Sequence, residues 1–487
     1  MNVARFVPSL VVCVGRGGWP RRLVGRLIGA LALLMLAAFA AGQAGSPAMD
    51  AGGSDLLSCS PAPCVIPPTQ LSFGPDIVAD APVVADPSNP EHLIVGGNDS
   101  NCPRQDGVLG FFLTSDGGSN WSNLVCMVPL FHGNAEYIPD FSPILAYDRN
   151  GVAYIGGFYL DDSGETSFGF EGFEKSSDGI TWSTPAPALA RRNHVPYDCW
   201  MAADTSVSSP FANSVYVSCV MDSLVPPYTI QMLVAHSNDG GATWEQVNVV
   251  PPRVTFDTYD YTAMTVGKDG TVYLAWQFCN TDNACDNGPV YMVFSKSSDG
   301  GNTWSKPNVI APVTLVYPLP NTQNIRDENT PAIGVDNSTG PHSGNLYVVM
   351  YNWTGTFMQV QVVRSTDGGN TWSKPVPVAP GFTHDQFFPW LSVSPTGLVG
   401  VSWLDRRNDP NNTNYQAFAT VSADGGRSFQ PGVELTPNFS DPNKGGVDWI
   451  GDYTGDTWDG PNYFVAAWMD NSNSQYMQDF VGGIRLK

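Results

Sequence analysis

The sequence predicts an all-β fold, a seven-bladed β-propeller of four-stranded antiparallel blades closed into a ring by an N-terminal strand. Three observations lead to this prediction. One turn motif recurs at a nearly constant spacing, two strand-like runs precede each turn, and an N-terminal segment resembles the last strand of the other units. A six-bladed propeller is the alternative, because the chain has six turns but seven pairs of strand-like runs.

The recurring turn reads SSDGGNTW at Ser297 to Trp304. Its Ser and Asp side chains can accept backbone N–H bonds, its Gly pair permits positive φ angles, and its Trp anchors the hairpin tip. The copies are TSDGGSNW (114–121), SSDGITW (176–182), SNDGGATW (237–244), SSDGGNTW (297–304), STDGGNTW (365–372) and SADGGRSF (422–429). Successive copies start 62, 61, 60, 68 and 57 residues apart, as expected for a repeat fold.

Two β-rich, nearly continuous apolar runs precede each turn, as in SPILAYD (142–148) and GVAYIGGFYL (151–160). A unit therefore reads strand a, strand b, loop, strand c, turn and strand d. The seventh unit ends without a strand d, and CVIPPTQLSF (64–73) resembles the d strands of the other units. We expect this segment to close the ring, so that residues 63–487 form a single propeller domain.

The first 44 residues have the pattern of a signal peptide. Residues 1–26 contain five arginines and no acid, and Leu27 to Ala41 is apolar. Small-residue patterns typical of signal-peptide cleavage lie at the end of this apolar run. The apolar run is too short for an uncleaved anchor. Residues 45–62, rich in Gly, Ser, Ala and Pro, are predicted to be a flexible leader. We expect a secreted protein, extracellular or periplasmic, without a transmembrane span after cleavage.

The charge of the chain argues against nucleic acid as a partner. The sequence has 23 basic and 45 acidic residues, a net charge of −22. Removal of the five N-terminal arginines gives 18 − 45 = −27. Such a surface repels nucleic acid and anionic lipid. The sequence leaves the oligomeric state open.

Eight of the nine cysteines follow the predicted signal peptide, and an even number in an exported chain favours disulfides. Eight cysteines allow about 105 connectivities. Nearness in sequence suggests the pairs Cys59–Cys64, Cys102–Cys126, Cys199–Cys219 and Cys279–Cys285. Cys199 and Cys219 flank the turn at residues 209–210 symmetrically, as an antiparallel hairpin would place them.

A metal requirement is not expected. The chain has no CxxC pair and no HExxH motif, and its six histidines are scattered. Calcium is the alternative, because Asp282 and Asp286 cluster with several amides between Gln277 and Gly288. That loop does not have EF-hand spacing, and a solvated loop is the simpler interpretation.

The recurring turns resemble the Asp boxes, or BNR repeats, of the sialidase superfamily, SxDxGxTW. Four copies match the hydroxyl, Asp, Gly and Trp positions in full, one has Phe429 in place of Trp, and one is a residue short. The resemblance covers nearly the whole mature chain, but it is weak for activity, since Asp boxes also occur in non-catalytic propellers. It implies that each box lies between strands c and d, on the face opposite the ligand site. A structural role is therefore expected for Asp116, Asp178, Asp239, Asp299, Asp367 and Asp424.

Loops predicted on the ligand face carry two rings of acids and amides. One ring, at the start of strand a, contains Asp80, Asp140, Asp198, Asp260, Asp327, Asp385 and Asp448. The other, at the end of strand b, contains Asp99, Asp161, Asp222, Asn280, Asn352, Asp405 and Asp470. Crowding would raise the pKa of some carboxyl groups and leave others ionised, as an acid/base pair or bound Ca²⁺ requires. The alternative is that these side chains cap backbone N–H groups.

Arginines also fall in the predicted ligand-face loops: Arg104, Arg191, Arg192, Arg253, Arg326, Arg406 and Arg407. Arginine binds carboxylates in a bidentate manner, as recognition of an acidic sugar would require. The alternative is that these arginines form ion pairs with the acid rings. The family resemblance implies three arginines for the sugar carboxylate, a tyrosine nucleophile paired with a glutamate, and an aspartate acid/base.

These considerations single out two groups of candidate residues. The catalytic candidates are Asp385, Asp327, Glu328 and Tyr453, with Glu136 as a second glutamate for the tyrosine. The substrate-binding candidates are Arg326, Arg406, Arg407, Asp140, Asp198 and Asp448. The chain departs from sialidases in lacking an Arg-Ile-Pro motif and in having seven units rather than six.

The sequence therefore supports two candidate functions. One is a secreted, glycan-recognising exo-glycosidase of sialidase-like type that acts on acidic sugars. The other is a non-catalytic propeller that binds carbohydrate or protein through the same face. In either case the expected partner is a glycan or a glycoprotein.

Overall fold

The computed structural model of the chain describes the following residues. They are 64–103, 108–132, 135–161, 169–253, 258–279, 288–322, 325, 330–444 and 450–486. All of them belong to one compact unit, Leu56–Lys487. The predicted signal peptide (1–44) and leader (45–62) lie outside this description. Among the described residues, no helix has the length and apolar character needed to cross a membrane.

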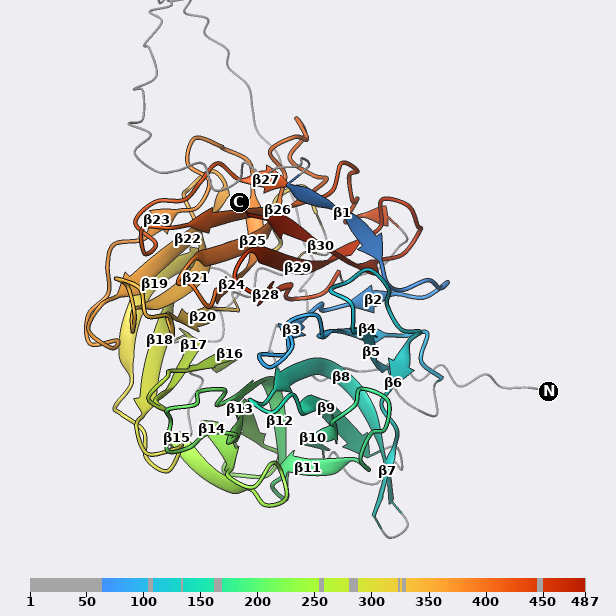
Figure 1. The fold of residues 1–487 in the computed structure, drawn as a ribbon, viewed down its shortest axis with the longest axis vertical. Coiled ribbons are helices and arrows are strands. Elements are labelled where there is room, and N and C mark those ends of the chain that lie inside the picture. Colours follow the sequence, from blue (N-terminus) through green and yellow to red (C-terminus); the bar gives the residue numbers. More distant parts are fainter. Residues whose placement is uncertain are drawn as a thin grey trace, which may run out of the picture. The chain divides into compact units, whose positions relative to one another are not determined.

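The described strands form seven antiparallel sheets, which confirms the predicted seven-bladed β-propeller over the six-bladed alternative (Figure 1). Blade 1 contains β2 (Val78–Ala79), β3 (Val83–Ala85), β4 (Leu93–Asp99), β5 (Leu109–Thr114) and β6 (Val125–Cys126). Blade 2 contains β7 (Leu130–His132), β8 (Ala135–Tyr147), β9 (Ala153–Asp161), β10 (Gly169–Ser176) and β11 (Ala186–Leu189). Blade 3 contains β12 (His194–Ala203), β13 (Val215–Ser223), β14 (Ile230–Ser237) and β15 (Glu245–Arg253).

The second half of the ring repeats this order. Blade 4 contains β16 (Thr258–Val266), β17 (Val272–Cys279), β18 (Gly288–Ser297) and β19 (Asn308–Leu315). Blade 5 contains β20 (Ala332–Val335), β21 (Leu346–Trp353), β22 (Met358–Ser365) and β23 (Val376–Pro377). Blade 6 contains β24 (Gln386–Val393), β25 (Val399–Asp405), β26 (Gln416–Ser422) and β27 (Val433–Glu434). Blade 7 contains β28 (Gly455–Asp459), β29 (Tyr463–Asp470), β30 (Gln478–Arg485) and β1 (Val65–Gln70).

The ring is closed by the N-terminal strand, as predicted. β1 pairs antiparallel with β30, with Val65 opposite Ile484 and Thr69 opposite Val481, so the two ends of the described chain share blade 7. The innermost strands contact one another in the cyclic order β3, β8, β12, β16, β20, β24, β28 and back to β3 (Figure 1). Because the ring is closed, every blade has a neighbouring blade on each of its two faces.

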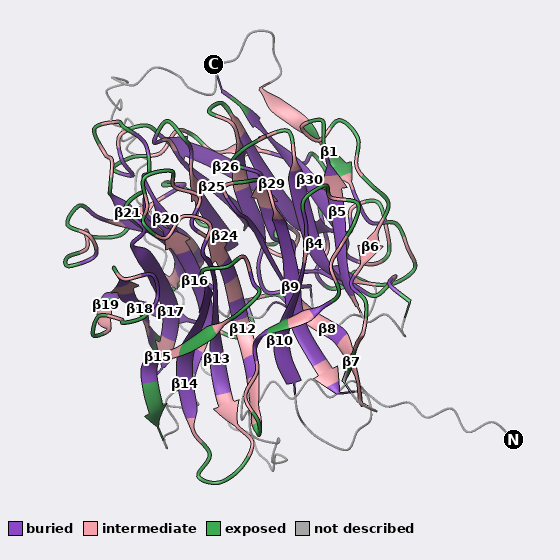
Figure 2. Cartoon of the chain, turned by 60° about the horizontal axis from the view of Figure 1, so that its bottom comes forward, coloured by how far each residue is buried: buried purple, intermediate pink, exposed green. Residues whose placement is uncertain are grey.

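The core lies between the blades, because each sheet packs against a neighbouring sheet on both faces. The middle strands β4, β25 and β26 are buried along their whole length, which explains their almost continuous apolar sequences. Outer strands such as β1 and β15 keep exposed positions (Figure 2). Three large side chains, Trp276, Trp403 and Trp468, are buried in this core.

The Asp-containing turns cap themselves with hydrogen bonds, as the sequence predicts. In the turn after β18, the Ser297 hydroxyl donates to Asp299 Oδ1 at 2.8 Å and accepts from the Gly301 N–H at 2.9 Å. The Thr303 N–H and hydroxyl donate to the two oxygens of the same carboxylate at 2.8 and 2.6 Å. Gly301 has a φ of 94°. Trp304 donates its indole N–H to the Gly301 carbonyl at 3.1 Å, which ties the aromatic anchor to the turn.

Neighbouring blades are joined through these turns. Lys175, near the end of β10, donates to the Gly240 carbonyl of the next blade's turn at 2.6 Å. Lys296, in β18, repeats this contact with Gly368 at 2.7 Å. The turns therefore brace the ring from blade to blade, which favours the structural role expected for their aspartates.

Two of the four predicted disulfides are confirmed, Cys102–Cys126 and Cys199–Cys219. Cys64 and Cys279 are also disulfide-bonded. Their predicted partners, Cys59 and Cys285, lie outside the described residues. The Cys199–Cys219 bond joins the first two strands of blade 3.

We expect Asp239→Asn to lower the melting temperature at pH 7. Hydrogen bonds from Thr243 lower the pKa of Asp239 to about 2. Because the folded-state pKa lies below the unfolded value, the ionised carboxylate contributes stability above about pH 4, and this contribution is lost as the pH falls toward 2. Thermal unfolding at pH 7, 4 and 2 should show a difference from the wild type that shrinks in acid. The exposed Asp76→Asn variant is the control, and equal melting of all three proteins at pH 7 would contradict the assignment.

Candidate functional site

The innermost strands carry β-bulges away from the Asp-containing turns. In blade 3, the pairing of β12 with β13 shifts between Tyr197 and Trp200, and Asp198 between them has a φ of 49°. Blades 4 and 6 repeat this arrangement at Tyr261 (φ 46°) and Phe388 (φ 47°). Left-handed conformations are costly for residues with bulky side chains, and bulges change the direction in which side chains point. The repeated bulges therefore redirect the inner strands at the axis.

Contacts between blades hold the bulges in place. The Tyr261 N–H donates to Asp198 Oδ2 at 3.3 Å, and the Thr262 hydroxyl donates to the Asp198 carbonyl at 2.9 Å. Across the closure of the ring, the Asp452 N–H donates to Asp80 Oδ1 at 2.7 Å. Acids of the predicted ring at the start of strand a thus accept backbone N–H bonds. The capping alternative holds for Asp80 and Asp198.

The bulges surround a small pocket on the propeller axis, to which six of the seven blades contribute. Its volume is about 30 Å³. It is lined by Asp80, Ser142, Asp198, Cys199, Trp200, Tyr261, Thr262, Thr330, Asp452 and Tyr453. A space of this size holds an ordered water or one functional group of a ligand, but not a whole sugar ring. We call it the axial pocket.

Two aromatic side chains that line the axial pocket, Trp200 and Tyr453, pack with Trp390 from a third blade. The Trp200 and Trp390 rings are 4.5 Å apart, and the Tyr453 ring lies 6.0 Å from Trp200 and 6.3 Å from Trp390. The Tyr453 hydroxyl donates to the Pro143 carbonyl at 3.1 Å. Burial raises the pKa of Tyr453 well above its usual value. The phenol is therefore neutral, and burial opposes its ionisation to a nucleophile.

Glu171 on β10 lies behind the pocket and interacts electrostatically with Tyr453. It is fully buried, and burial raises its pKa well above the usual value. A carboxylate oxygen of Glu171 and the sulfurs of Cys199 and Cys219 lie within 4.8 Å of one another. The two sulfurs are bonded to each other, so this trio offers no thiolate to a metal. Of the glutamates predicted to pair with Tyr453, Glu136 lies in β8, and Glu328 lies outside the described residues.

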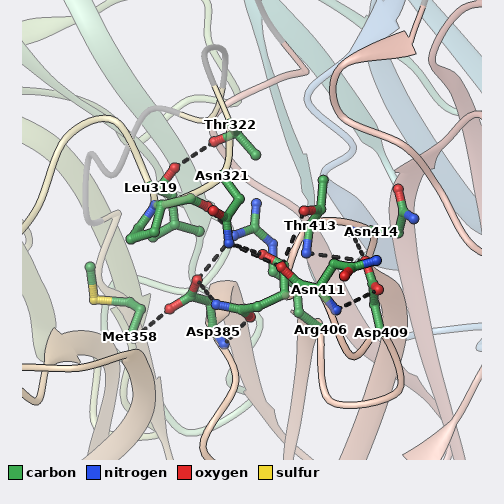
Figure 3. A network of polar contacts seen from close by, with 12 residues as sticks. Leu319, Asn321, Thr322, Met358, Asp385, Arg406, Asp409, Asn411, Thr413 and Asn414 are labelled. Carbon is green, nitrogen blue, oxygen red and sulfur yellow. Dashed lines mark hydrogen bonds and ion pairs between the residues drawn. The ribbon is translucent and has the colours of Figure 1, made fainter. Parts of the chain in front are cut away.

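Asp385 and Arg406 form a buried ion pair rather than part of the axial pocket (Figure 3). Both side chains are 0% exposed, and Arg406 Nη1 lies 3.0 Å from Asp385 Oδ2. Asp385 also accepts hydrogen bonds from the Met358 N–H at 2.8 Å and the Asn412 amide at 2.7 Å. Arg406 donates to the Pro320 carbonyl at 2.8 Å. This placement favours the ion-pair alternative over the catalytic and substrate-binding roles predicted for the two residues.

Arg407 is likewise engaged by its own blade. Its guanidinium pairs with Asp405 and lies 3.8 Å from the centre of the Phe382 ring and 4.3 Å from that of Phe418. Its side chain is 5% exposed. Stacking between two rings leaves little of the guanidinium open to a ligand. Arg407 thus also fits the ion-pair alternative.

The remaining predicted residues divide into three groups. Arg326, Asp327, Glu328 and Asp448 lie outside the described residues. Asp140 lies at the bulge of β8, where burial raises its pKa, and it does not line the axial pocket. Among the substrate-binding candidates, Asp198 lines the pocket, together with Tyr453 from the catalytic candidates.

The sequence prediction missed Trp200 and Asp452 as site residues. Both lie within two residues of a left-handed position, Asp198 in blade 3 and Gly451 in blade 7. Trp390 follows Phe388 in the same way in blade 6. The aromatic residue within each inner strand was visible in the sequence, but the left-handed position two residues before it was not.

We expect Asp385→Asn to destabilise the fold strongly, because it removes the carboxylate that forms the ion pair with the buried Arg406 guanidinium. Removal of one partner of a buried ion pair costs about 3–5 kcal/mol. Denaturant unfolding should show this loss, and the double variant Asp385→Asn/Arg406→Met should recover part of it. A single variant as stable as the wild type would contradict the structural role.

Comparison with known proteins supports the resemblance seen in the turns. No family model matches the chain. A sialidase of Micromonospora viridifaciens is 28% identical over 230 residues, which cover 44% of this chain and 33% of that protein. The chain thus matches about a third of the length of its curated relative.

Solved structures with similar folds include glycosidases. The Hadza microbial sialidase Hz136 is 16% identical, with a TM-score of 0.43 and coverage of 81% of this chain and 74% of that one. The GH93 α-L-arabinofuranosidase of Fusarium graminearum is 10% identical, with a TM-score of 0.46 and coverage of 87% and 98%. At these scores the two structures add nothing to what the strand pairing shows. The turns and the curated relative confirm the predicted resemblance, and the chain is a seven-bladed, sialidase-like β-propeller.

Proposed function

We propose that this protein is a secreted glycan-recognising propeller that holds a terminal group of its ligand in the axial pocket. The observation that carries the proposal is the meeting of carboxylates and aromatic rings from four blades at one point on the axis, in a pocket that six blades line. Aromatic faces pack against the apolar faces of sugars, and carboxylates accept hydrogen bonds from sugar hydroxyls. The curated sialidase relative supports a glycan as the ligand class.

Hydrolysis is the second candidate function, favoured by the grouping of Asp80, Asp198 and Asp452 around the axial pocket. A glycosidase needs one carboxyl group as acid and a second group as base or nucleophile. Asp198 is the half-exposed member of the three, and it takes over the acid/base role that the sequence suggested for Asp385. Arg326 remains the proposed contact for an acidic sugar, because Arg406 and Arg407 are held in ion pairs.

The proposal predicts that Asp198→Asn weakens glycan binding at least tenfold, a loss of about 1.4 kcal/mol. Binding should be measured on an array of neutral and acidic glycans, and the best ligand should then be titrated by calorimetry. Asp76→Asn is the matched control, and circular dichroism should show that both variants fold. Wild-type affinity in Asp198→Asn would place the ligand elsewhere, and an array without any bound glycan would contradict the proposed function.

Hydrolysis requires a separate measurement. A panel of fluorogenic glycosides, including sialosides and arabinosides, should be incubated with the wild type and with Asp198→Asn. Release of fluorophore by the wild type that falls at least a hundredfold in the variant would assign an acid/base role to Asp198. A glycan that binds on the array but is not cleaved from any aryl glycoside would favour the non-catalytic function.

A further inference from the structure

Three arginines at one end of blade 3 form no ion pair. Arg191 and Arg192 lie between β11 and β12, and Arg253 ends β15. Among the described residues no carboxylate lies within ion-pair distance of any of the three, although the chain has 45 acidic and only 23 basic residues. Arg406 and Arg407, in contrast, each pair with a carboxylate of their own blade. Neutralisation by ion pairs therefore explains those two arginines but not the three in blade 3.

The start of β14 brings two of these arginines together. Arg191 donates from Nη1 to the side-chain oxygen of Gln231 at 3.1 Å. Gln231 is 0% exposed, so its amide is a fixed acceptor that holds the guanidinium in place. The preceding residue, Ile230, is the β-sheet partner of Arg253. Arg191 and Arg253 are thus carried to the same end of blade 3 by a buried side chain and a strand pair.

The segment that contains Arg192 is tied to the loop between β13 and β14. The Leu224 N–H of this loop donates to the Asn193 carbonyl at 2.8 Å. The same loop carries Tyr228, whose side chain is 56% exposed. Arg192 and Arg253 are also exposed, and Figure 2 shows exposed positions along this loop and at the end of β15. We call Arg191, Arg192, Arg253 and Tyr228 the rim patch.

The rim patch is suited to an anionic group carried by a sugar. The planar guanidinium group of arginine binds two oxygens of an oxyanion at once, and an exposed tyrosine ring packs against the apolar face of a sugar. A long polyanion would extend over the rest of a chain with a net charge of −22. Repulsion between such charges acts over a Debye length of about 8 to 10 Å. The patch therefore favours a short chain with one or a few anionic groups.

Strand β12 connects the rim patch to the axial pocket. It begins at His194, whose Nδ1 lies 2.9 Å from the Arg192 carbonyl. Four residues further along the strand is Asp198, which lines the pocket. At a rise of 3.3 Å per residue this separation is about 13 Å, which a short oligosaccharide can span.

We propose that the rim patch binds a carboxylate or sulfate group of the glycan whose terminal group lies in the axial pocket. The inference rests on the proposed function for the glycan, and it adds an acidic group to the description of that ligand. It assigns recognition of this group to arginines outside the axial pocket, because Arg406 and Arg407 are held in ion pairs. The axial pocket and the rim patch then recognise different parts of one chain.

An array of paired glycans tests this inference on the full mature chain. Each carboxylated or sulfated glycan stands beside its uncharged parent, and the wild type should bind the charged member at least tenfold more tightly. In Arg192→Gln/Arg253→Gln this ratio should fall below threefold, whereas Asp198→Asn should weaken both members and keep the ratio. Both substituted arginines are exposed, and circular dichroism should show that the variant folds. Arg427→Gln is the matched control, because Arg427 is an exposed arginine in the turn of blade 6.

Several outcomes would overturn the inference. A wild type that binds the uncharged parents as tightly as the charged glycans would do so while leaving the proposed function intact. An unchanged ratio in the double variant would also contradict it. Arg326 lies outside the described residues, and loss of the preference in Arg326→Gln but not in the double variant would place the anionic group there instead. Equal competition by poly-L-glutamate would show attraction of any polyanion and would likewise overturn the inference.

Discussion

Pairing of β1 with β30 is the interaction on which the rest of the structure depends. Each blade buries both faces against its neighbours, so a ring that failed to close would expose blade 7 on one side and blade 1 on the other. The same closure brings the Asp452 N–H to the Asp80 carboxylate. The wall of the axial pocket therefore depends on two chain segments separated by nearly the whole domain.

The pKa of an aspartate shifts in opposite directions in the surface turns and in the space between the blades. Aspartates of the turns are surrounded by N–H and hydroxyl donors at the surface, and these hydrogen bonds lower the pKa of Asp239 and Asp367 to about 2. Carboxyl groups between the blades have few donors, and burial raises the pKa of Asp456 to about 7. Donors stabilise the ionised form and burial penalises it, so position in the blade decides which aspartates carry charge.

The arginines show why residue type alone does not identify a site. Arg406 and Arg407 follow the end of β25, where the sequence suggested contacts with an acidic ligand. Each instead neutralises a carboxylate of its own blade, Asp385 or Asp405. The Arg407 guanidinium, which is enclosed by aromatic rings and an acid, holds loops together. The network in Figure 3 includes a further contact between loops, in which the Asn321 amide donates to the Asn411 carbonyl. In the proposed function, recognition rests on Asp198 and on the aromatic residues Trp200 and Tyr453 of the axial pocket.

The sequence by itself determined the blade number and the closing strand, because these follow from local patterns repeated about every 60 residues. Nearness in sequence predicted the two confirmed disulfides. It also placed Asp198 and Tyr453 near the ligand face. Only the tertiary structure decided that Asp385 is buried against Arg406 and that Trp200, Trp390 and Tyr453 meet on the axis. Those outcomes depend on bulges and on contacts between blades that are distant in sequence. The residue pattern of a single strand does not indicate which side chains of other blades will contact it.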